Sequence, residues 1–261
     1  MSHDPVYDTV PRRVRRRQRK KRSPLAIVVG IIGELMITAG LFIGLFVVWQ
    51  VWWTDVEARG AQLEMREQFE KDADDVDFTD VIEDDEKRYD DAPALPDAAP
   101  GEVIGYLRAP VWDEYFRGEY NWSVAEHTEP MMTGLDQGHI VRYQNTADPG
   151  HEGNFALAGH RQSYGATFHH VDKLELGDAL IFEAQTHWFV YRVSETDIVL
   201  PTDVDVIAPN PDDPGSAATE KLLTLTTCHP LFSTRERFIV HAEFDYWAPK
   251  SAGVPREILE D

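Results

Sequence analysis

The chain has 261 residues, 43% of them hydrophobic, which suffices for one packed domain with accessory segments. Its formal net charge is -21, and the excess of acidic over basic residues argues against a nucleic-acid partner. The single cysteine excludes an internal disulfide and any cysteine-rich zinc site, so the purpose of one free thiol has to be explained.

A basic segment precedes an apolar one at the N-terminus. Residues 1–24 contain the run RRVRRRQRKKR, and residues 25–53 are almost wholly apolar. This stretch exceeds the about 20 residues that a bilayer-spanning helix needs. Because positive charge stays on the cytoplasmic side, we expect a cytoplasmic tail at 1–24, one transmembrane helix at 25–53 and an extracellular remainder, anchored in the plasma membrane. Glu34 inside the span is costly in lipid, and the sequence names no partner for it.

A cleaved signal peptide is the competing interpretation of this stretch. Its apolar region would be about 7 to 15 residues long and would end in a small-residue cleavage site. The sequence WQVWWT offers no such site. Its tryptophans, Trp49, Trp52 and Trp53, are typical of the aromatic belt at a membrane interface.

Residues 54–100 are acidic and partly rich in proline and alanine, with too few apolar residues to fold alone. We interpret them as an extracellular linker whose first turns, up to about Lys71, extend the membrane helix. The acidic block lacks the ligand spacing and the glycine of an EF-hand loop, so a solvated spacer is favoured over a calcium site.

From Glu102 onward the sequence turns to short strand-like runs separated by Gly, Pro, Asp and Asn, with no long helical pattern and no internal repeat. An all-β barrel is therefore predicted. Only residues 164–174 are typical of a short helical turn, with Phe168 and Leu174 packing inward. The predicted strands are residues 103–108, 139–144, 154–159, 179–184, 187–193, 222–228 and 237–244.

The cysteine lies in LLTLTTCHPLFSTRERFIV, residues 222–240. Leu223 and Leu225 alternate with threonines, so Cys228 ends a strand on the face opposite the leucines. Arg237 begins the next strand on the face opposite Phe238 and the apolar residues that follow it at intervals of two. A thiolate attacks carbonyl carbon, and a guanidinium receives the charge that develops on the carbonyl oxygen. Cys228 and Arg237 are therefore candidates for one groove, although a buried structural cysteine and a surface arginine fit the same pattern.

The motif TLTTC, with an arginine nine positions after the cysteine, resembles the TLxTC active-site strand of sortases, the membrane-anchored cysteine transpeptidases of Gram-positive cell envelopes. Residues 153–178, GNFALAGHRQSYGATFHHVDKLELGD, resemble the segment with the family's catalytic histidine, and TLTTCHPLFS is most like the class E group. The resemblance covers residues 101–247 and implies an eight-stranded sortase-type β-barrel with short helices. Residues 248–261 are then a C-terminal tail, loosely held from residue 251.

The resemblance assigns Cys228 as the nucleophile, His160 as the general acid and base, and Arg237 as the oxyanion stabiliser. It also gives Thr227 a role in positioning substrate. Strand parity alone leaves Arg235 open as a competitor of Arg237, and the family register favours Arg237. No spacing in the chain resembles a metal-ligand cluster, so we expect no metal and no cofactor.

The function implied is transpeptidation: cleavage of a C-terminal sorting signal of LAxTG or LPxTG type between Thr and Gly. The secreted protein that carries the signal would be joined through a thioester to the amine of a lipid II-type cell-wall precursor. A pilus-polymerising sortase that uses a pilin lysine is one alternative. Another envelope cysteine enzyme is a second, and a non-catalytic adhesion or sensor ectodomain is a third.

Overall fold

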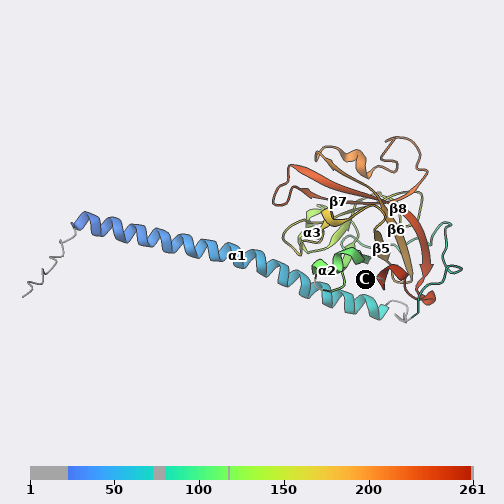
Figure 1. Cartoon of the computed structure of the whole chain (residues 1–261), viewed down its shortest axis with the longest axis horizontal. Helices are drawn as coiled ribbons and strands as arrows, with labels where there is room; N and C mark the ends of the chain where they lie inside the picture. The colour runs from blue at the N-terminus through green and yellow to red at the C-terminus, as the bar shows by residue number, and fades with distance from the viewer. Residues whose placement is uncertain (1–22, 73–79, 117, 260–261) are drawn as a thin grey trace, which may run out of the picture. The chain divides into compact units, whose positions relative to one another are not determined.

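A computed structural model describes residues 23–72, 80–116 and 118–259, and eight strands close a β-barrel in the order β1-β2-β3-β4-β7-β8-β6-β5 (Figure 1). The predicted all-β class and strand number are confirmed. Two neighbouring pairs, β2 with β3 and β4 with β7, are parallel, and the others are antiparallel. The strands are β1 Val103–Arg108, β2 Asn121–Ala125, β3 Ile140–Arg142, β4 Gly153–Ala158, β5 Ala179–Glu183, β6 His187–Val199, β7 Lys221–His229 and β8 Glu236–Pro249.

The helices outside the N-terminal region are short, as the resemblance implies. The α-helices are α1 Pro24–Asp72, α2 Asp113–Phe116 and α3 Met132–Asp136. The 3-10 helices are η1 Pro110–Trp112, η2 Val171–Lys173, η3 Val204–Ile207, η4 Lys250–Ala252 and η5 Arg256–Ile258.

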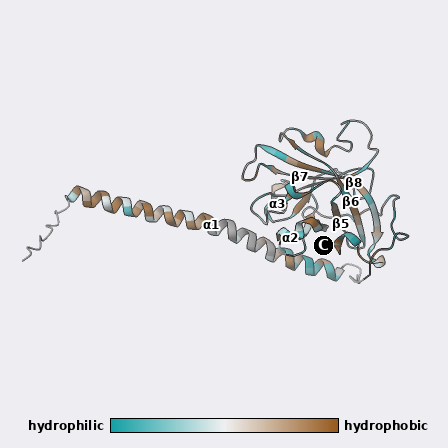
Figure 2. Ribbon diagram, in the orientation of Figure 1, coloured by the Kyte–Doolittle hydropathy of each residue, from teal (hydrophilic) through white to brown (hydrophobic). Residues whose placement is uncertain are grey.

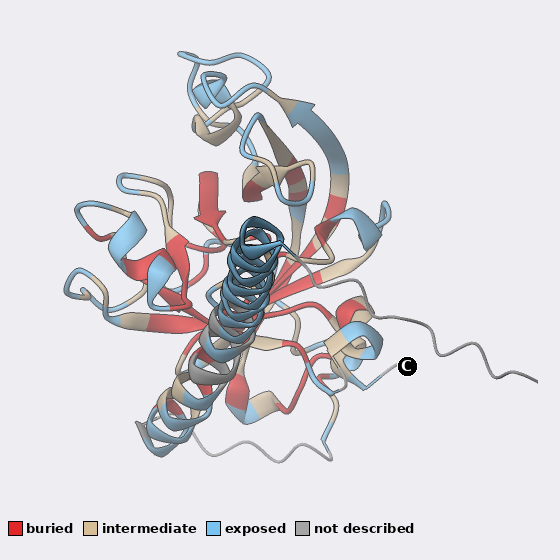
Figure 3. Ribbon diagram, turned by 90° about the vertical axis from the view of Figure 1, so that its left-hand side faces the viewer, coloured by how far each residue is buried: buried red, intermediate tan, exposed pale blue. Residues whose placement is uncertain are grey.

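Side chains of the strands alternate between the inside of the barrel and its outer face. In β5, Leu180 and Phe182 lie in the main core, whereas Ile181 between them lies in a second apolar cluster. Ile82 and Val254 pack into that second cluster from outside the barrel sheet. Figure 3 shows most of the barrel strands as buried. The interior is therefore filled by side chains, and catalysis has to use a strand end or an outer face.

Three local features differ from the sequence-based expectations. The sequence does not predict β2, whose alternation is confined to Trp122, Ser123 and Val124. The turn expected at 164–174 is helical only in η2, although Phe168 and Leu174 are buried in the core as expected. The loosely held tail is wrong for residues 253–255, which are buried, because Val254 inserts into the outer apolar cluster.

Helix α1 changes character along its length. Its residues Pro24–Trp49 are apolar and exposed, and they are long enough to cross a membrane. Figure 2 shows this apolar part in brown and a hydrophilic C-terminal end in teal. Met1–Trp49 and Gln50–Asp261 form two separate units, and the second unit contains the C-terminal part of α1 together with the barrel.

Within the second unit, one face of α1 packs against the barrel. Gln62 is buried and bridges two backbone groups: its side-chain nitrogen donates to the carbonyl oxygen of Gly138, and its oxygen accepts from the N–H of Ser123. Gly138 has φ +85, and a Cβ there would lie 3.1 Å from the Cβ of Ala58. The glycine therefore permits both the left-handed backbone and the close approach of the helix.

Glu183 on β5 joins this helix to the barrel through a buried ion cluster. The carboxylate accepts two hydrogen bonds from Arg66 of α1, both at 2.9 Å, one from Arg108 of β1 and one from Lys250 of η4, each at 2.8 Å. Burial opposes ionisation of Glu183, but the charge of Arg108 and the contacts with Arg66 and Lys250 lower its pKa to about 2. Three elements distant in sequence are thus held by one carboxylate.

Parts of the acidic stretch 54–100 are packed on the barrel. Besides Gln62, Phe69, Ile82 and Ala92 are buried, and the backbone of Arg88 exchanges two hydrogen bonds with that of Trp247 in β8. A fully solvated spacer would not bury these side chains. The predicted extension of the membrane helix ends at Asp72.

We expect Glu183→Gln to lower the free energy of unfolding by about 3–5 kcal/mol, because it leaves buried cations without their countercharge. Glu175→Gln, at an exposed carboxylate, is the control and should change it by less than about 0.5 kcal/mol. Urea denaturation of the full chain in detergent measures both. Since the folded pKa of about 2 lies below the usual 4.5, the stabilisation by Glu183 is complete above pH 4.5 and is lost as the pH falls toward 2. Equal stability of the two variants would contradict a central role for this cluster.

Candidate active site

The thiol and the arginine lie opposite each other on neighbouring strands. In the antiparallel pair of β7 and β8, Cys228 is the partner of Arg237, and Thr227 is the partner of Phe238. Directly opposite residues of an antiparallel pair have Cβ atoms about 4.5–5.5 Å apart and share one face of the sheet. Leu225 and Val240 of the same strands belong to the core cluster. The parity therefore puts Cys228 and Arg237 on the outer face, and both are partly exposed.

The histidine comes from the strand on the other side of β7. In the parallel pair of β4 and β7, Ala158 is aligned with Thr226, and the N–H of Gly159 donates to the carbonyl oxygen of Thr226. His160 follows directly. Carrying this register two residues beyond Ala158 sets His160 beside Cys228. Cys228 and Arg237 thus lie on neighbouring strands, and His160 lies just after the strand on the other side of the cysteine.

Arg237 is held by its own loop. Its Nη1 donates to the carbonyl oxygens of Thr234 and Glu236, at 3.1 and 2.9 Å. These bonds keep the guanidinium near the start of β8, beside its cross-strand partner Cys228. Arg235 lies in the loop and is exposed. The strand register therefore separates two arginines that sequence parity cannot separate.

Thr227 is buried, and its hydroxyl donates to the carbonyl oxygen of Gly159 at 2.7 Å. Its contact is with the backbone that carries His160. The threonine thus ties the ends of β4 and β7 together, next to the thiol.

Arg161 connects the loop after β4 to the end of β7, a role that the sequence does not reveal. Its guanidinium is buried and donates to Nδ1 of His229 at 2.9 Å and to Asp172 at 3.0 Å, with a longer contact of 3.5 Å to the carbonyl oxygen of Cys228. These contacts fix the loop after β4 to the end of β7. The bond also engages Nδ1 of His229, the neighbour of Cys228 in sequence.

Two further residues surround His160. Its Nε2 lies 3.0 Å from Oδ1 of Asp136, at the end of α3, and the ring of Tyr164 stacks on the imidazole with 5.3 Å between centroids. Because a carboxylate only accepts, Nε2 donates this bond and Nδ1 remains for proton exchange. Tyr164 has φ +48, a left-handed conformation that is costly outside glycine. The contact between Asp136 and His160 spans 24 residues, and no motif in the sequence announces it.

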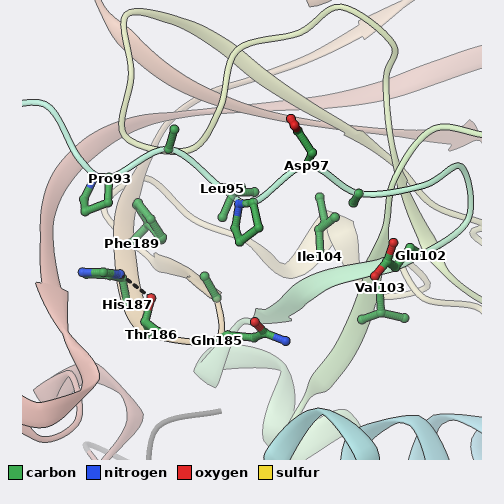
Figure 4. A pocket seen from close by; sticks show the side chains of 14 residues that line it. Pro93, Leu95, Asp97, Glu102, Val103, Ile104, Gln185, Thr186, His187 and Phe189 are labelled. Atoms are coloured by element: carbon green, nitrogen blue, oxygen red, sulfur yellow. Dashed lines mark hydrogen bonds between the residues drawn. The ribbon is translucent and has the colours of Figure 1, made fainter. Parts of the chain in front are cut away.

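A cavity of about 160 Å³ lies away from these residues (Figure 4). Figure 4 shows Pro93 and Leu95 of the segment before β1 on one side and Phe189 of β6 nearby. Its lining residue His187 pairs with Pro249, at the opposite end of β8 from Arg237. Cys228 does not line this cavity.

Comparison with known proteins agrees with this geometry. The family model described as "Sortase domain" matches residues 116–245. The sortase SrtE2 of Streptomyces coelicolor is 35% identical over 233 residues, which cover 86% of this chain and 86% of the relative. The sortase SrtE1 of the same organism is 33% identical over 252 residues, covering 94% of this chain but only 65% of that longer relative.

Solved structures give the same result. The SrtA sortase from Actinomyces oris superposes with a TM-score of 0.62 at 39% identity, covering 67% of this chain and 97% of that one. Sortase E from Streptomyces avermitilis superposes with a TM-score of 0.53 at 35% identity, covering 62% of this chain and 99% of that one. The protein therefore belongs to the sortase family of cysteine transpeptidases, and the predicted likeness to the class E group is confirmed.

Proposed function

We propose that this sortase cleaves a C-terminal sorting signal between Thr and Gly through Cys228 and joins the released acyl group to the amine of a cell-wall precursor. The family implies an enzyme that anchors proteins by transpeptidation. The observation that carries the residue assignment is the strand order β4-β7-β8, in which Cys228 and Arg237 are partners near the facing ends of β7 and β8 and His160 follows the end of β4.

In the first half of the reaction, the thiolate of Cys228 attacks the threonine carbonyl carbon. The negative charge that develops on the carbonyl oxygen is received by the guanidinium of Arg237, on the strand beside the nucleophile. His160, as imidazolium, gives the proton on Nδ1 to the leaving glycine nitrogen as the C–N bond breaks. A thioester on Cys228 and a neutral imidazole result.

In the second half, an amine attacks the thioester carbonyl carbon. The neutral Nδ1 of His160 takes the proton of the attacking nitrogen, and the C–S bond breaks to release the thiolate. The contact of Nε2 with Asp136 holds the ring so that the same nitrogen serves both halves. Thr227 contributes indirectly by fixing the carbonyl of Gly159 next to the histidine.

The likeness to class E supports an LAxTG-type signal in place of LPxTG. The apolar helix near the N-terminus suggests a single-pass membrane anchor, and the basic run before it supports an extracellular catalytic barrel. A transpeptidation assay with LAxTG and LPxTG peptides, and with a glycine or a diaminopimelate acceptor, tests the signal. Preference for a pilin lysine as acceptor would move the proposal to pilus polymerisation.

Cys228→Ala and His160→Ala should each abolish transpeptidation without unfolding the barrel, because both side chains lie outside the core. His151→Ala is the matched control, since His151 lies before β4 and His160 after it, at opposite ends of one strand. Peptide turnover and far-UV circular dichroism check both points. A tenth or more of wild-type turnover in either variant would remove that residue from the mechanism.

Arg237→Ala should lower turnover at least about a hundredfold, the typical cost of losing an oxyanion donor. Arg235→Ala should change it by less than tenfold, because Arg235 is exposed in the loop. Arg237→Lys should remain strongly impaired, since an ammonium does not reproduce the planar guanidinium. Steady-state kinetics on the sorting peptide measure all three. A collapse for Arg235→Ala with normal turnover for Arg237→Ala would reverse the assignment.

Protease added to intact protoplasts should digest the barrel and leave residues 1–24 protected, because the basic run stays inside. Antibodies against the two ends of the chain provide the readout, with protoplasts lysed in detergent as the control. A protected barrel and a cleaved tail would contradict both the orientation and the proposed substrates.

A further inference from the structure

A cavity of about 420 Å³ lies beside His160, on the side of the histidine that carries Asp136. One wall comes from the C-terminal part of α1 and the other from the loops around α3 and after β4. The α1 wall contains Ala58, Ala61 and Met65, and the loop wall includes Asp136, His139 and Tyr164.

Asp136 and Tyr164 are at once lining residues of this cavity and the two groups that contact the His160 ring. His160 itself follows the strand end that is bonded to Thr226 and Thr227, next to Cys228. His160 therefore contacts two residues of the cavity wall and follows the strand end that pairs with β7.

Among the described residues that line the cavity, Asp136 alone carries a formal charge. His139 does not offset it, because burial lowers the pKa of His139 and its Nδ1 is engaged with the hydroxyl of Ser123 at 2.7 Å. The remaining lining groups are small, apolar or neutral. A cationic ligand with a slender, partly apolar body matches this combination of charge and shape.

We propose that this cavity is the binding site of the acyl acceptor, a primary amine whose ammonium group is drawn in by Asp136. This inference rests on the proposed function and assigns the second substrate a place on the chain. The sorting peptide and the acceptor then approach Cys228 from different sides, with His160 facing the acceptor.

The chemistry of the step is balanced with the residues present. After acylation His160 is neutral, so the incoming ammonium gives one proton to Nδ1 and becomes a nucleophilic amine. Its nitrogen forms a bond to the thioester carbon, the C–S bond breaks, and Cys228 leaves as thiolate. The attacking nitrogen gives its second proton to solvent water as the amide forms. Asp136 changes neither charge nor bonding; it concentrates the cation beside the base.

The test compares hydrolysis of the thioester with its attack by an added nucleophile, and it uses the full-length chain in detergent. With the sorting peptide saturating, the rate of hydrolysis without acceptor reports on Cys228, His160 and Arg237. Titration with triglycine reports on the acceptor site, and titration with hydroxylamine provides a small uncharged nucleophile that does not need an anionic wall. Asp136→Asn weakens the contact that holds the His160 ring, so turnover falls in all three reactions. The acceptor site is read from the KM: we expect the KM for triglycine to rise about three- to tenfold, while the KM for hydroxylamine stays within about twofold.

Two controls match this variant. Glu129→Gln removes an exposed carboxylate shortly before α3 and should leave all three rates unchanged. Ala61→Leu adds a side chain inside the cavity and should raise the KM for triglycine. Gly60→Leu adds the same side chain one residue earlier, where nothing lies within 4 Å of a Cβ, and should leave that KM unchanged.

Each outcome decides between the proposals. An equal change in the KM for triglycine and in the KM for hydroxylamine in Asp136→Asn would leave Asp136 only as the residue that positions His160, and would overturn the acceptor site. An unchanged KM for triglycine in both Asp136→Asn and Ala61→Leu would also overturn the acceptor site. Hydrolysis by the wild-type chain would still leave the proposed function standing. Absence of any peptide cleavage by the wild-type chain would defeat the proposed function itself.

Discussion

The pairing of β7 between a parallel and an antiparallel neighbour is the constraint on which the site depends. Backbone hydrogen bonds to β4 on one side and β8 on the other fix the register of Cys228 against both strands. Because the side-chain period of a strand is two, a slip of one residue would turn the thiol into the core. Leu223 and Leu225, which fill the core from the same strand, prevent that slip. Packing of the barrel interior and placement of the Cys228 thiol are therefore one requirement.

Polar side chains near the strand ends hold the adjoining loops in place as well. Thr227 and Arg161 tie the segment after β4 to the end of β7, and Arg237 is held by carbonyl groups of its own loop. Since loop residues are otherwise the more mobile part of a fold, such bonds hold the proposed acid–base group and the proposed oxyanion donor near the proposed nucleophile. The left-handed backbone of Tyr164, in contact with the histidine, belongs to the same ordered region.

The C-terminal part of α1 is a component of this unit and not only a continuation of the apolar span. Gln62 binds the carbonyl of Gly138, two residues from Asp136, and Arg66 reaches the buried carboxylate of Glu183. The helix thus supports the loop that contacts His160 and also forms a wall of the neighbouring cavity. Support of the loop and enclosure of the cavity follow from the same set of contacts.

The sequence by itself determined the barrel class, most of its strands and the three candidate catalytic residues. These are local signals: alternation of period two, turn residues, an apolar run after basic charge and a motif that resembles a family. Asp136, the bracing role of Arg161, the burial of Val254 and the ion cluster of Glu183 were decided only by the tertiary structure. Each of these joins residues far apart in the chain, and a polar or charged side chain looks alike in sequence whether solvent or a buried partner receives it. The preference for Arg237 over Arg235 drew on both: parity allowed either arginine, the family resemblance favoured Arg237, and the strand register then placed Arg237 opposite Cys228.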